Sequence, residues 1–448
     1  MLLLAAWVMI GCEPVNEPTT EEGGTTTVDD SNIASVNKVT NYYGTIYEVI
    51  LKDGNRMYFG IKNDSEVRMG KWSYFYDGSE YEYEKYAEYE YKGHLVIPEK
   101  ITLEGKEYTV TELYDMSHAD IGYYVANTTL LSVVVPNTIK KITSRCFEAC
   151  TALKSVKFEK GSPIQELVGC CFKGCSSLEE VILPDNLSFI GTESWGETFA
   201  LCTSLKTINL PKTVTKIQDR TFLECTALEN INLENVKVIG KGTFTGCTSL
   251  ENVDLDKLEV LGVNTFNGCT SLKKVELPNA NKIMDNAFHG CISLEDVKLD
   301  NLEVLGVNAF DSCTSLKQIE LPSIKYLGVA VDEEKDKMWW GSGDAFNDCH
   351  SLETVVLGSS LLSTNSGDLF NGCNNMNDVY CYAVNPPMDT DWEEGDTDYR
   401  TILGDFVLHV PASSIESYKE TNWGAIAYYV ESWLVQWDWE RTIVAIEE

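Results

Sequence analysis

The chain has 448 residues, and its 35 Lys and Arg against 69 Asp and Glu give a formal net charge of −34 at pH 7. Phosphates of nucleic acids and anionic membrane surfaces would repel such a charge, which argues against binding to either through charge alone. Because 44% of the residues are hydrophobic, disorder of the whole chain is excluded too.

The N-terminal residues 1–12 are an apolar run that ends in Gly11-Cys12. The run is too short to span a bilayer, which takes about 20 residues in a helix. It resembles a bacterial lipoprotein signal, in which Cys12 would be the lipid anchor, although a plain cleaved signal or an accidental apolar start are alternatives. Residues 13–37 begin with a stretch that is rich in Pro, Thr, Gly and acids, so we expect a disordered acidic tether there.

A Phe-x-x-Cys step recurs ten times in the middle of the chain. After each Cys the pattern Leu-x-x-Val/Ile-x-Leu follows at a constant offset, with variants in the first and last copies. The unit is 22–25 residues long, apart from two insertions, and a fixed period of this size indicates a solenoid. The ten steps are Phe147/Cys150, Phe172/Cys175, Phe199/Cys202, Phe222/Cys225, Phe244/Cys247, Phe266/Cys269, Phe288/Cys291, Phe310/Cys313, Phe346/Cys349 and Phe370/Cys373.

Each unit predicts one coil. The alternation in Val/Ile-x-Leu places these side chains on one face of a short strand, a second apolar pair begins the return, and a tight turn carries Phe and Cys inward. A coil of 22 residues cannot bury its apolar face alone. The coils must therefore stack, with neighbouring strands about 4.8 Å apart.

The copy with Phe244, Cys247, Leu250, Val253 and Leu255 closely resembles the BspA-type leucine-rich repeat of bacterial surface proteins. This resemblance implies a β-rich solenoid of about eleven right-handed coils with short helical or irregular turns. We assign 116–381 to this solenoid. The flanking segments resemble the family's caps, so we assign 38–115 to a β-rich N-terminal cap domain and 382–448 to a small C-terminal cap and tail.

Ten of the fifteen cysteines occupy the same position of the repeat. We interpret them as packed thiols that donate S–H to turn carbonyls. The five scattered His and the lack of Cys-x-x-Cys pairs argue against a metal site. Cys146 and Cys171 precede their Phe on neighbouring coils, where a spacing of about 5 Å would permit a disulfide.

Two rows of outward residues follow the predicted strands. The first, from Lys154 to Glu353, mostly alternates in charge between neighbouring coils, which favours a role in register and solubility. The second row ends at Tyr380 and is more mixed. If it lines a concave face, it is the default recognition surface of a solenoid.

Both insertions occupy one slot of the repeat, between the second apolar pair and the Phe. One carries Trp195, and the other, from Val329 to Asp344, carries Trp339 and Trp340. Tryptophan on a loop can anchor a protein partner or stack on a sugar, and it can also fold back and become buried. We take these three tryptophans, and Tyr380 second, as candidate contact residues.

The sequence has no catalytic signature such as G-x-S-x-G, H-E-x-x-H or a P-loop, so we expect neither an enzyme nor a cofactor. The family resemblance implies a cell-surface protein that binds host or bacterial surface proteins. From the N-terminal signal we expect lipid to anchor it to the outer membrane, and we expect a monomer. A glycan-binding accessory lipoprotein for polysaccharide capture is the alternative, and a purely structural surface-layer protein is a third possibility.

Overall fold

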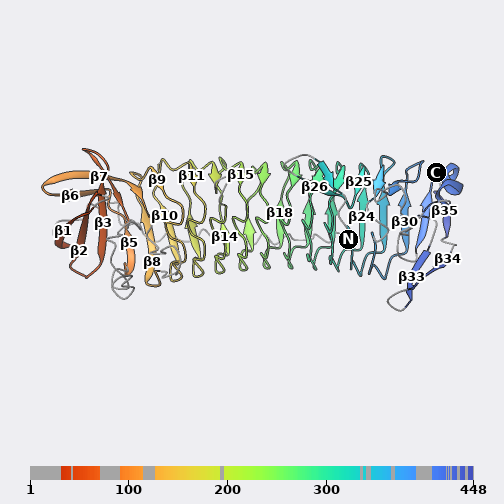
Figure 1. Ribbon diagram of the computed structural model, residues 1–448, viewed down its shortest axis with the longest axis horizontal. Coiled ribbons are helices and arrows are strands. Elements are labelled where there is room, and N and C mark those ends of the chain that lie inside the picture. The colour runs from red at the N-terminus through yellow and green to blue at the C-terminus, as the bar shows by residue number, and fades with distance from the viewer. Residues whose placement is uncertain are drawn as a thin grey trace, which may run out of the picture.

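Figure 1 shows the computed structural model as a long rod of stacked coils. The structure describes residues 32–41, 44–70, 91–114, 127–191, 196–332, 337–339, 345–364, 369–389, 406–419, 421, 423, 426–430, 434–438 and 442–446. For 41, 44, 330–332, 337–339, 388–389, 426–430 and 434–438 it describes the backbone alone. Each coil has two strand segments and one turn side, so the rod has three sides. The predicted fold class, a leucine-rich-repeat solenoid, is confirmed.

The first side is formed by the Val/Ile-x-Leu strands, which we call the long ladder. Neighbouring strands are parallel and in register, as in the pairing of Val253 with Val275, and they form four consecutive sheets. Successive side chains alternate between the core and the surface. The members are β5 (Gly93–Val96), β8 (Leu130–Val135), β10 (Ser155–Phe158), β12 (Glu180–Ile182), β14 (Thr207–Ile208), β16 (Asn230–Ile231), β18 (Asn252–Asp254), β20 (Lys274–Glu276), β22 (Asp296–Lys298), β24 (Gln318–Leu321), β28 (Thr354–Leu357), β30 (Asp378–Cys381), β32 (Val407–Val410) and β35 (Ile443–Ala445).

The second side is formed by the return strands, which we call the short ladder. Each of its described strands has two residues, the first outward and the second buried in most coils. The members are β9 (Lys141–Ile142), β11 (Glu166–Leu167), β13 (Phe189–Ile190), β15 (Lys216–Ile217), β17 (Val238–Ile239), β19 (Val260–Leu261), β21 (Lys282–Ile283), β23 (Val304–Leu305), β25 (Tyr326–Leu327), β29 (Ser363–Thr364) and β31 (Met388–Asp389); the hairpin of β26 (Ala330–Asp332) and β27 (Lys337–Trp339) follows β25.

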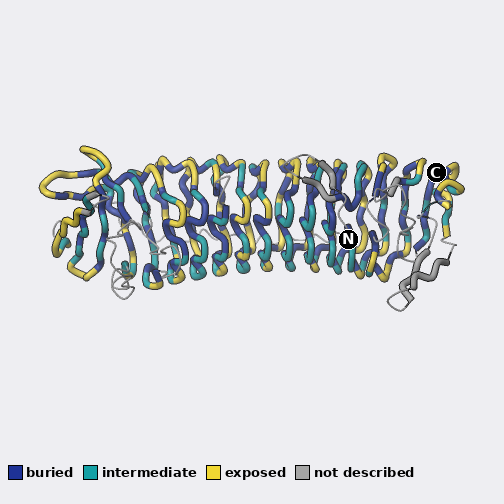
Figure 2. Tube along the Cα trace, in the orientation of Figure 1, coloured by how far each residue is buried: buried dark blue, intermediate teal, exposed yellow. Residues whose placement is uncertain are grey.

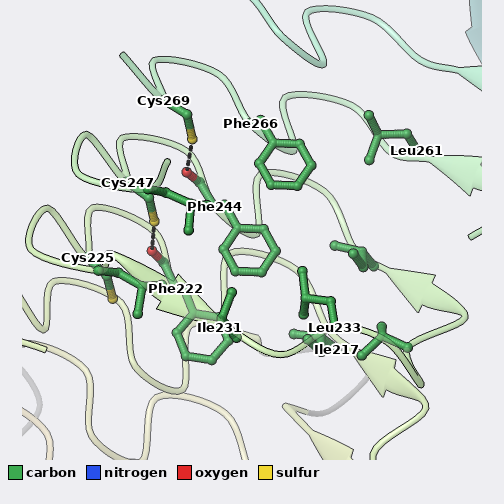
Figure 3. Packing of buried hydrophobic residues seen from close by; sticks show 14 of the residues in the cluster. Ile217, Phe222, Cys225, Ile231, Leu233, Phe244, Cys247, Leu261, Phe266 and Cys269 are labelled. Atoms are coloured by element: carbon green, nitrogen blue, oxygen red, sulfur yellow. Dashed lines mark hydrogen bonds between the residues drawn. The ribbon is translucent and has the colours of Figure 1, made fainter. Parts of the chain in front are cut away.

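The third side places the repeat Phe and Cys in the core (Figure 3). The ten Phe rings stack along the rod with centroids 5.2–5.9 Å apart. Nine cysteines donate S–H to the carbonyl of the Phe one coil earlier, at 3.0–3.3 Å, as Cys247 does to Phe222. The expected packed thiols are thus confirmed, and Figure 2 shows the buried residues as a continuous band along the rod.

The turn beside each Phe contains left-handed backbone. Residues two before and two after the Phe have positive φ in most coils, as do Asn264 (φ 57°) and Gly268 (φ +73°) around Phe266. Several of these positions hold a residue with a Cβ, such as Glu224 (φ 54°), where that conformation is strained. The turn geometry therefore does not depend on glycine in every coil.

This geometry predicts opposite effects of two substitutions. Gly268→Ala should lower the free energy of unfolding by about 1 kcal/mol, because the left-handed backbone disfavours a Cβ. A Cβ there would come no closer than 3.9 Å to the backbone of Gly246, so crowding adds nothing. Glu224→Gly should raise the free energy of unfolding, by up to about 1 kcal/mol. Thermal unfolding of both variants would contradict this account if the two shifts had the same sign.

The N-terminal cap is a sheet with strand order β1-β2-β3-β4-β7-β6, in which β9 also pairs with β7. Its strands are β1 (Ile33–Asn41), β2 (Gly44–Leu51), β3 (Arg56–Ile61), β4 (Glu66–Met69), β6 (Lys100–Leu103) and β7 (Lys106–Leu113). The expected end of the tether at residue 37 was wrong, because Ile33 already pairs with Leu51 in this sheet. The pairing of β7 with β9 makes the cap continuous with the first coil.

The C-terminal cap closes the other end of the rod. It contains η4 (Ala412–Ser414), α1 (Ile415–Lys419) and the hairpin of β33 (Ile426–Val430) and β34 (Leu434–Asp438). The fully buried Tyr418 donates its hydroxyl to the carbonyl of Ala383 at 2.9 Å and contacts Trp423 edge-on. The long ladder continues through this cap, since β32 and β35 pair beyond β30.

Candidate recognition surface

The outward side of the long ladder carries the second row expected from the sequence, here called the outer row. Backbone pairing joins Asp254 to Glu276 and Lys298, and Glu320 to Val356 and onward. The predicted register is therefore confirmed where these pairings are described. The row comprises Lys157, Ile182, Asn209, Asn232, Asp254, Glu276, Lys298, Glu320, Val356 and Tyr380, and the structure adds His409 and Val444.

The charged row from Lys154 to Glu353 lies beside the outer row. Its members stack on neighbouring coils, where the amide of Glu179 donates to the carbonyl of Lys154 at 2.9 Å. Lys273 and Glu251 form an ion pair at 3.1 Å, and both side chains are more than half exposed. Such pairs contribute a few tenths of a kcal/mol. The expected alternation thus places opposite charges on neighbouring coils, and its role in register and solubility stays a prediction.

The middle of the face is strongly charged. Lys274 forms ion pairs with Glu276 at 2.6 Å and with Asp296 at 3.5 Å, and Lys298 reaches Glu276 at 3.2 Å. The hydrogen bond from Lys274 lowers the pKa of Glu276, and Lys298 adds to this effect. Two shallow depressions lie here, one over β18 and β20 and one over β22, β24 and β28. Both are lined by acids and a lysine, so this part of the face is polar.

The C-terminal end of the outer row differs in chemistry. The rings of Tyr380 and His409 stack with centroids 4.1 Å apart and planes 13° apart. His409 Nε2 lies 2.7 Å from Asp378 Oδ1, which fixes the imidazole in place. Val356 and Val444 flank the two rings in the row. This cluster, Asp378, Tyr380, His409, Val356 and Val444, is here called the aromatic patch, and all its members are partly exposed.

The stacking decides which part of each ring can meet a ligand. Side chains stand roughly perpendicular to a sheet, so rings on neighbouring strands pair face to face. One face of Tyr380 is covered by His409 in this way. A partner meets ring edges, the Tyr hydroxyl and the flanking valines rather than a flat open platform.

Sequence reasoning placed Tyr380 at the end of this row but missed His409 and Val444. Their strands, β32 and β35, belong to coils without the Phe-x-x-Cys step, so the repeat did not mark them. The signal for His409 was the alternation Leu408-His409-Val410 before Pro411, which matches the strand pattern of the regular coils.

The other candidate contact residues lie largely outside the described residues. Trp195 and Trp340 are outside them, and so is Cys12. Trp339 ends β27, whose backbone pairs antiparallel with β26 at Ala330, but its side chain is not described. Their roles stay predictions.

The repeat positions behave as expected with one difference. Phe244, Cys247, Leu250 and Leu255 are fully buried or nearly so, whereas Val253 is only partly buried and packs against the edge of the core.

The structure has no disulfide between Cys146 and Cys171, and both are reduced, buried thiols. The Cys171 sulfur instead lies against the backbone of Cys146 and Phe147, and burial raises its pKa. The two coils are joined at this point by the amide of Phe147, which donates to the carbonyl of Cys171 at 2.8 Å.

Within the part of the chain that the structure describes, no three His, Cys, Asp or Glu side chains come together as a metal site. Nor does any helix in that part have the length and apolar character to cross a membrane.

Comparison with known proteins places the chain in a family. The BspA type leucine rich repeat region matches in copies that cover 120–251, 171–280, 237–331 and 342–384, together more than half of the chain. The chain belongs to the BspA-type leucine-rich repeat family. No curated protein matches the chain.

Several solved structures are similar to this BspA-type chain in sequence at a low level. A leucine rich cell surface protein from Faecalibacterium prausnitzii is 20% identical over 77% of this chain and 94% of its own, with a TM-score of 0.39. A leucine-rich repeat protein from Bacteroides ovatus is 22% identical over 72% and 92%, with a TM-score of 0.33. The pneumococcal vaccine antigen PcpA is 19% identical over 93% and 100%, with a TM-score of 0.46.

Proposed function

We propose that the protein is a non-enzymatic cell-surface protein that recognises partner proteins through the outward side of the long ladder. The aromatic patch is the main contact, because it combines aromatic and valine surface with Asp378 and His409 at a fixed position. Protein interfaces concentrate their binding energy in such partly apolar, aromatic clusters. The charged middle of the face would then contribute orientation and association rate.

The observation that carries this proposal is the face-to-face stack of Tyr380 and His409. A pyranose ring binds an open aromatic face, and His409 covers one face of Tyr380. This arrangement favours a protein partner over polysaccharide at the patch. The glycan alternative rests on Trp195, Trp339 and Trp340, whose side chains are not described.

Binding should depend on the patch. The double variant Tyr380→Ala/His409→Ala should bind its partner on a glycoprotein array at least about 30-fold more weakly, since loss of an interface hot spot removes about 2 kcal/mol or more. Tyr326→Ala is the matched control, because Tyr326 is a partly exposed tyrosine on the short ladder. We expect it to bind within about twofold of the parent chain.

The same experiment includes a glycan array and a Trp339→Ala/Trp340→Ala variant. Polysaccharide binding that this variant loses would overturn the proposal in favour of glycan capture. Protein binding that survives loss of the patch would overturn the choice of site.

We also propose that the chain is exported and held at the outer membrane by lipid on Cys12. Radiolabelled fatty acid should enter the parent chain in bacterial cells and be absent from Cys12→Ser. Labelling of Cys12→Ser, or none of the parent chain, would contradict the anchor. In the described chain, the aromatic patch lies at the end of the rod opposite the N-terminal cap.

A further inference from the structure

The short ladder carries an exposed apolar row that the proposed function does not use. Phe189, Val238 and Val260 are 44%, 48% and 39% exposed, and they occupy the same outward position on β13, β17 and β19. The next valine of this row, Val304, is only 4% exposed. The row is thus exposed over its first coils and becomes buried at Val304.

Charged residues complete the row. The order along the rod is Glu166, Phe189, Lys216, Val238, Val260 and Lys282, which we call the strip. It begins with the acid Glu166 and ends with the base Lys282, and between them lie three apolar residues and Lys216. A second copy that runs in the opposite direction would therefore place its basic end against the acidic end of the first copy.

We propose that two copies of the chain associate weakly through this strip, in antiparallel orientation. The two-fold axis runs along the strand direction, between the coils of Lys216 and Val238. In this register Glu166 meets Lys282 twice and Phe189 meets Val260 twice. Lys216 meets Val238, along which its aliphatic stem can pack while the ammonium group reaches solvent.

Two other arrangements bring like charges together. With the rods parallel, each strip residue would face its own copy, so Lys216 would meet Lys216 and Lys282 would meet Lys282. Moving the axis by one coil, between Val238 and Val260, places Lys216 against Lys282. Like charges at an interface disfavour association, so the charges disfavour these two arrangements, and only the proposed register pairs Glu166 with Lys282.

The adjoining residues agree with this register. The residues directly before the strip positions would meet in the pairs Gln165–Asn281, Ser188–Glu259 and Thr215–Lys237, and none of these pairs joins like charges. The strip is six coils long and narrow. Interfaces below about 1,200 Å² in total are weak and transient, and the net charge of −34 on each copy opposes association further.

Charge exchange tests the proposal with the full chain. Sedimentation velocity over a range of concentrations should show a monomer–dimer equilibrium for the parent chain. Lys282→Glu and Glu166→Lys should each weaken the dimer at least tenfold. Lys298→Glu, on the long ladder, is the control with the same charge change and should dimerise like the parent.

Two restorations make the test specific. The double variant Glu166→Lys/Lys282→Glu should dimerise again, and the two single variants should associate when mixed, since both ion pairs then re-form. A parent chain that stays monomeric at all concentrations, or a dimer that Lys282→Glu leaves unchanged, would overturn the proposal. The patch variants act on another side of the rod, so the result is independent of the proposed function.

Discussion

Phe266→Ala should lower the free energy of unfolding by about 3–5 kcal/mol, the usual loss for a large aromatic side chain in a core. The ring is fully buried and stacks at 5.3 Å on Phe244 and at 5.6 Å on Phe288. Removing it leaves a cavity that touches two neighbouring coils. The coils cannot close this gap, because the strand ladders fix their spacing.

The loss should be local in the rod. Each coil contacts only its neighbours, so amides of the coils around Phe266 should exchange hydrogen faster, while those near β35 keep their protection. Phe189→Ala is the control, because Phe189 is 44% exposed on the short ladder and should lose less than about 1 kcal/mol. Equal losses in the two variants would contradict the stacked core.

Stability should fall steeply above pH 9 because of the buried thiols. Burial raises the pKa of Cys225 to about 12 from an ordinary value of 9.0. Unfolded chains therefore lose this proton at a lower pH than folded ones. The stability that the raised pKa contributes is complete below pH 9 and is lost as the pH rises toward 12.

The fall of the free energy of unfolding with pH has a definite slope. Each such cysteine contributes about 1.4 kcal/mol per pH unit in this window, and burial raises the pKa of Cys247, Cys269 and Cys291 as well. Urea unfolding between pH 7 and 11 measures it. Cys225→Ser should make the slope shallower by one proton, because Ser does not titrate there. A slope that this variant leaves unchanged would show that other groups dominate.

The repeat made most of the fold predictable. A Phe, a Cys and an alternating apolar strand recur at fixed offsets, so register, core and the row through Tyr380 follow from spacing alone. Beyond the last Phe-x-x-Cys step the prediction failed. The long ladder continues through β32 and β35, which the motif does not mark, so His409 was missed. The start of the first sheet at Ile33 was also missed, because its neighbours are polar and resemble the tether.

The disulfide considered possible between Cys146 and Cys171 shows another limit. Spacing between coils permits the bond, but the direction of each sulfur depends on side-chain packing, which the sequence does not give. The candidate site was predictable only in part for the same reason. Tyr380 could be placed on a face, whereas its stacking on a neighbouring ring could not.

The bonds from each Cys to the Phe one coil back have a consequence for how the length of this protein can vary. Because every donor reaches a carbonyl of the preceding coil, removal of one whole 22-residue unit would bring Cys291 to the carbonyl of Phe244 in place of that of Phe266. No donor inside the rod would lose its acceptor. Gain or loss of whole units thus changes the length of the rod and preserves its interior. Insertion or deletion of a single residue inside a unit would instead disrupt the register of both ladders.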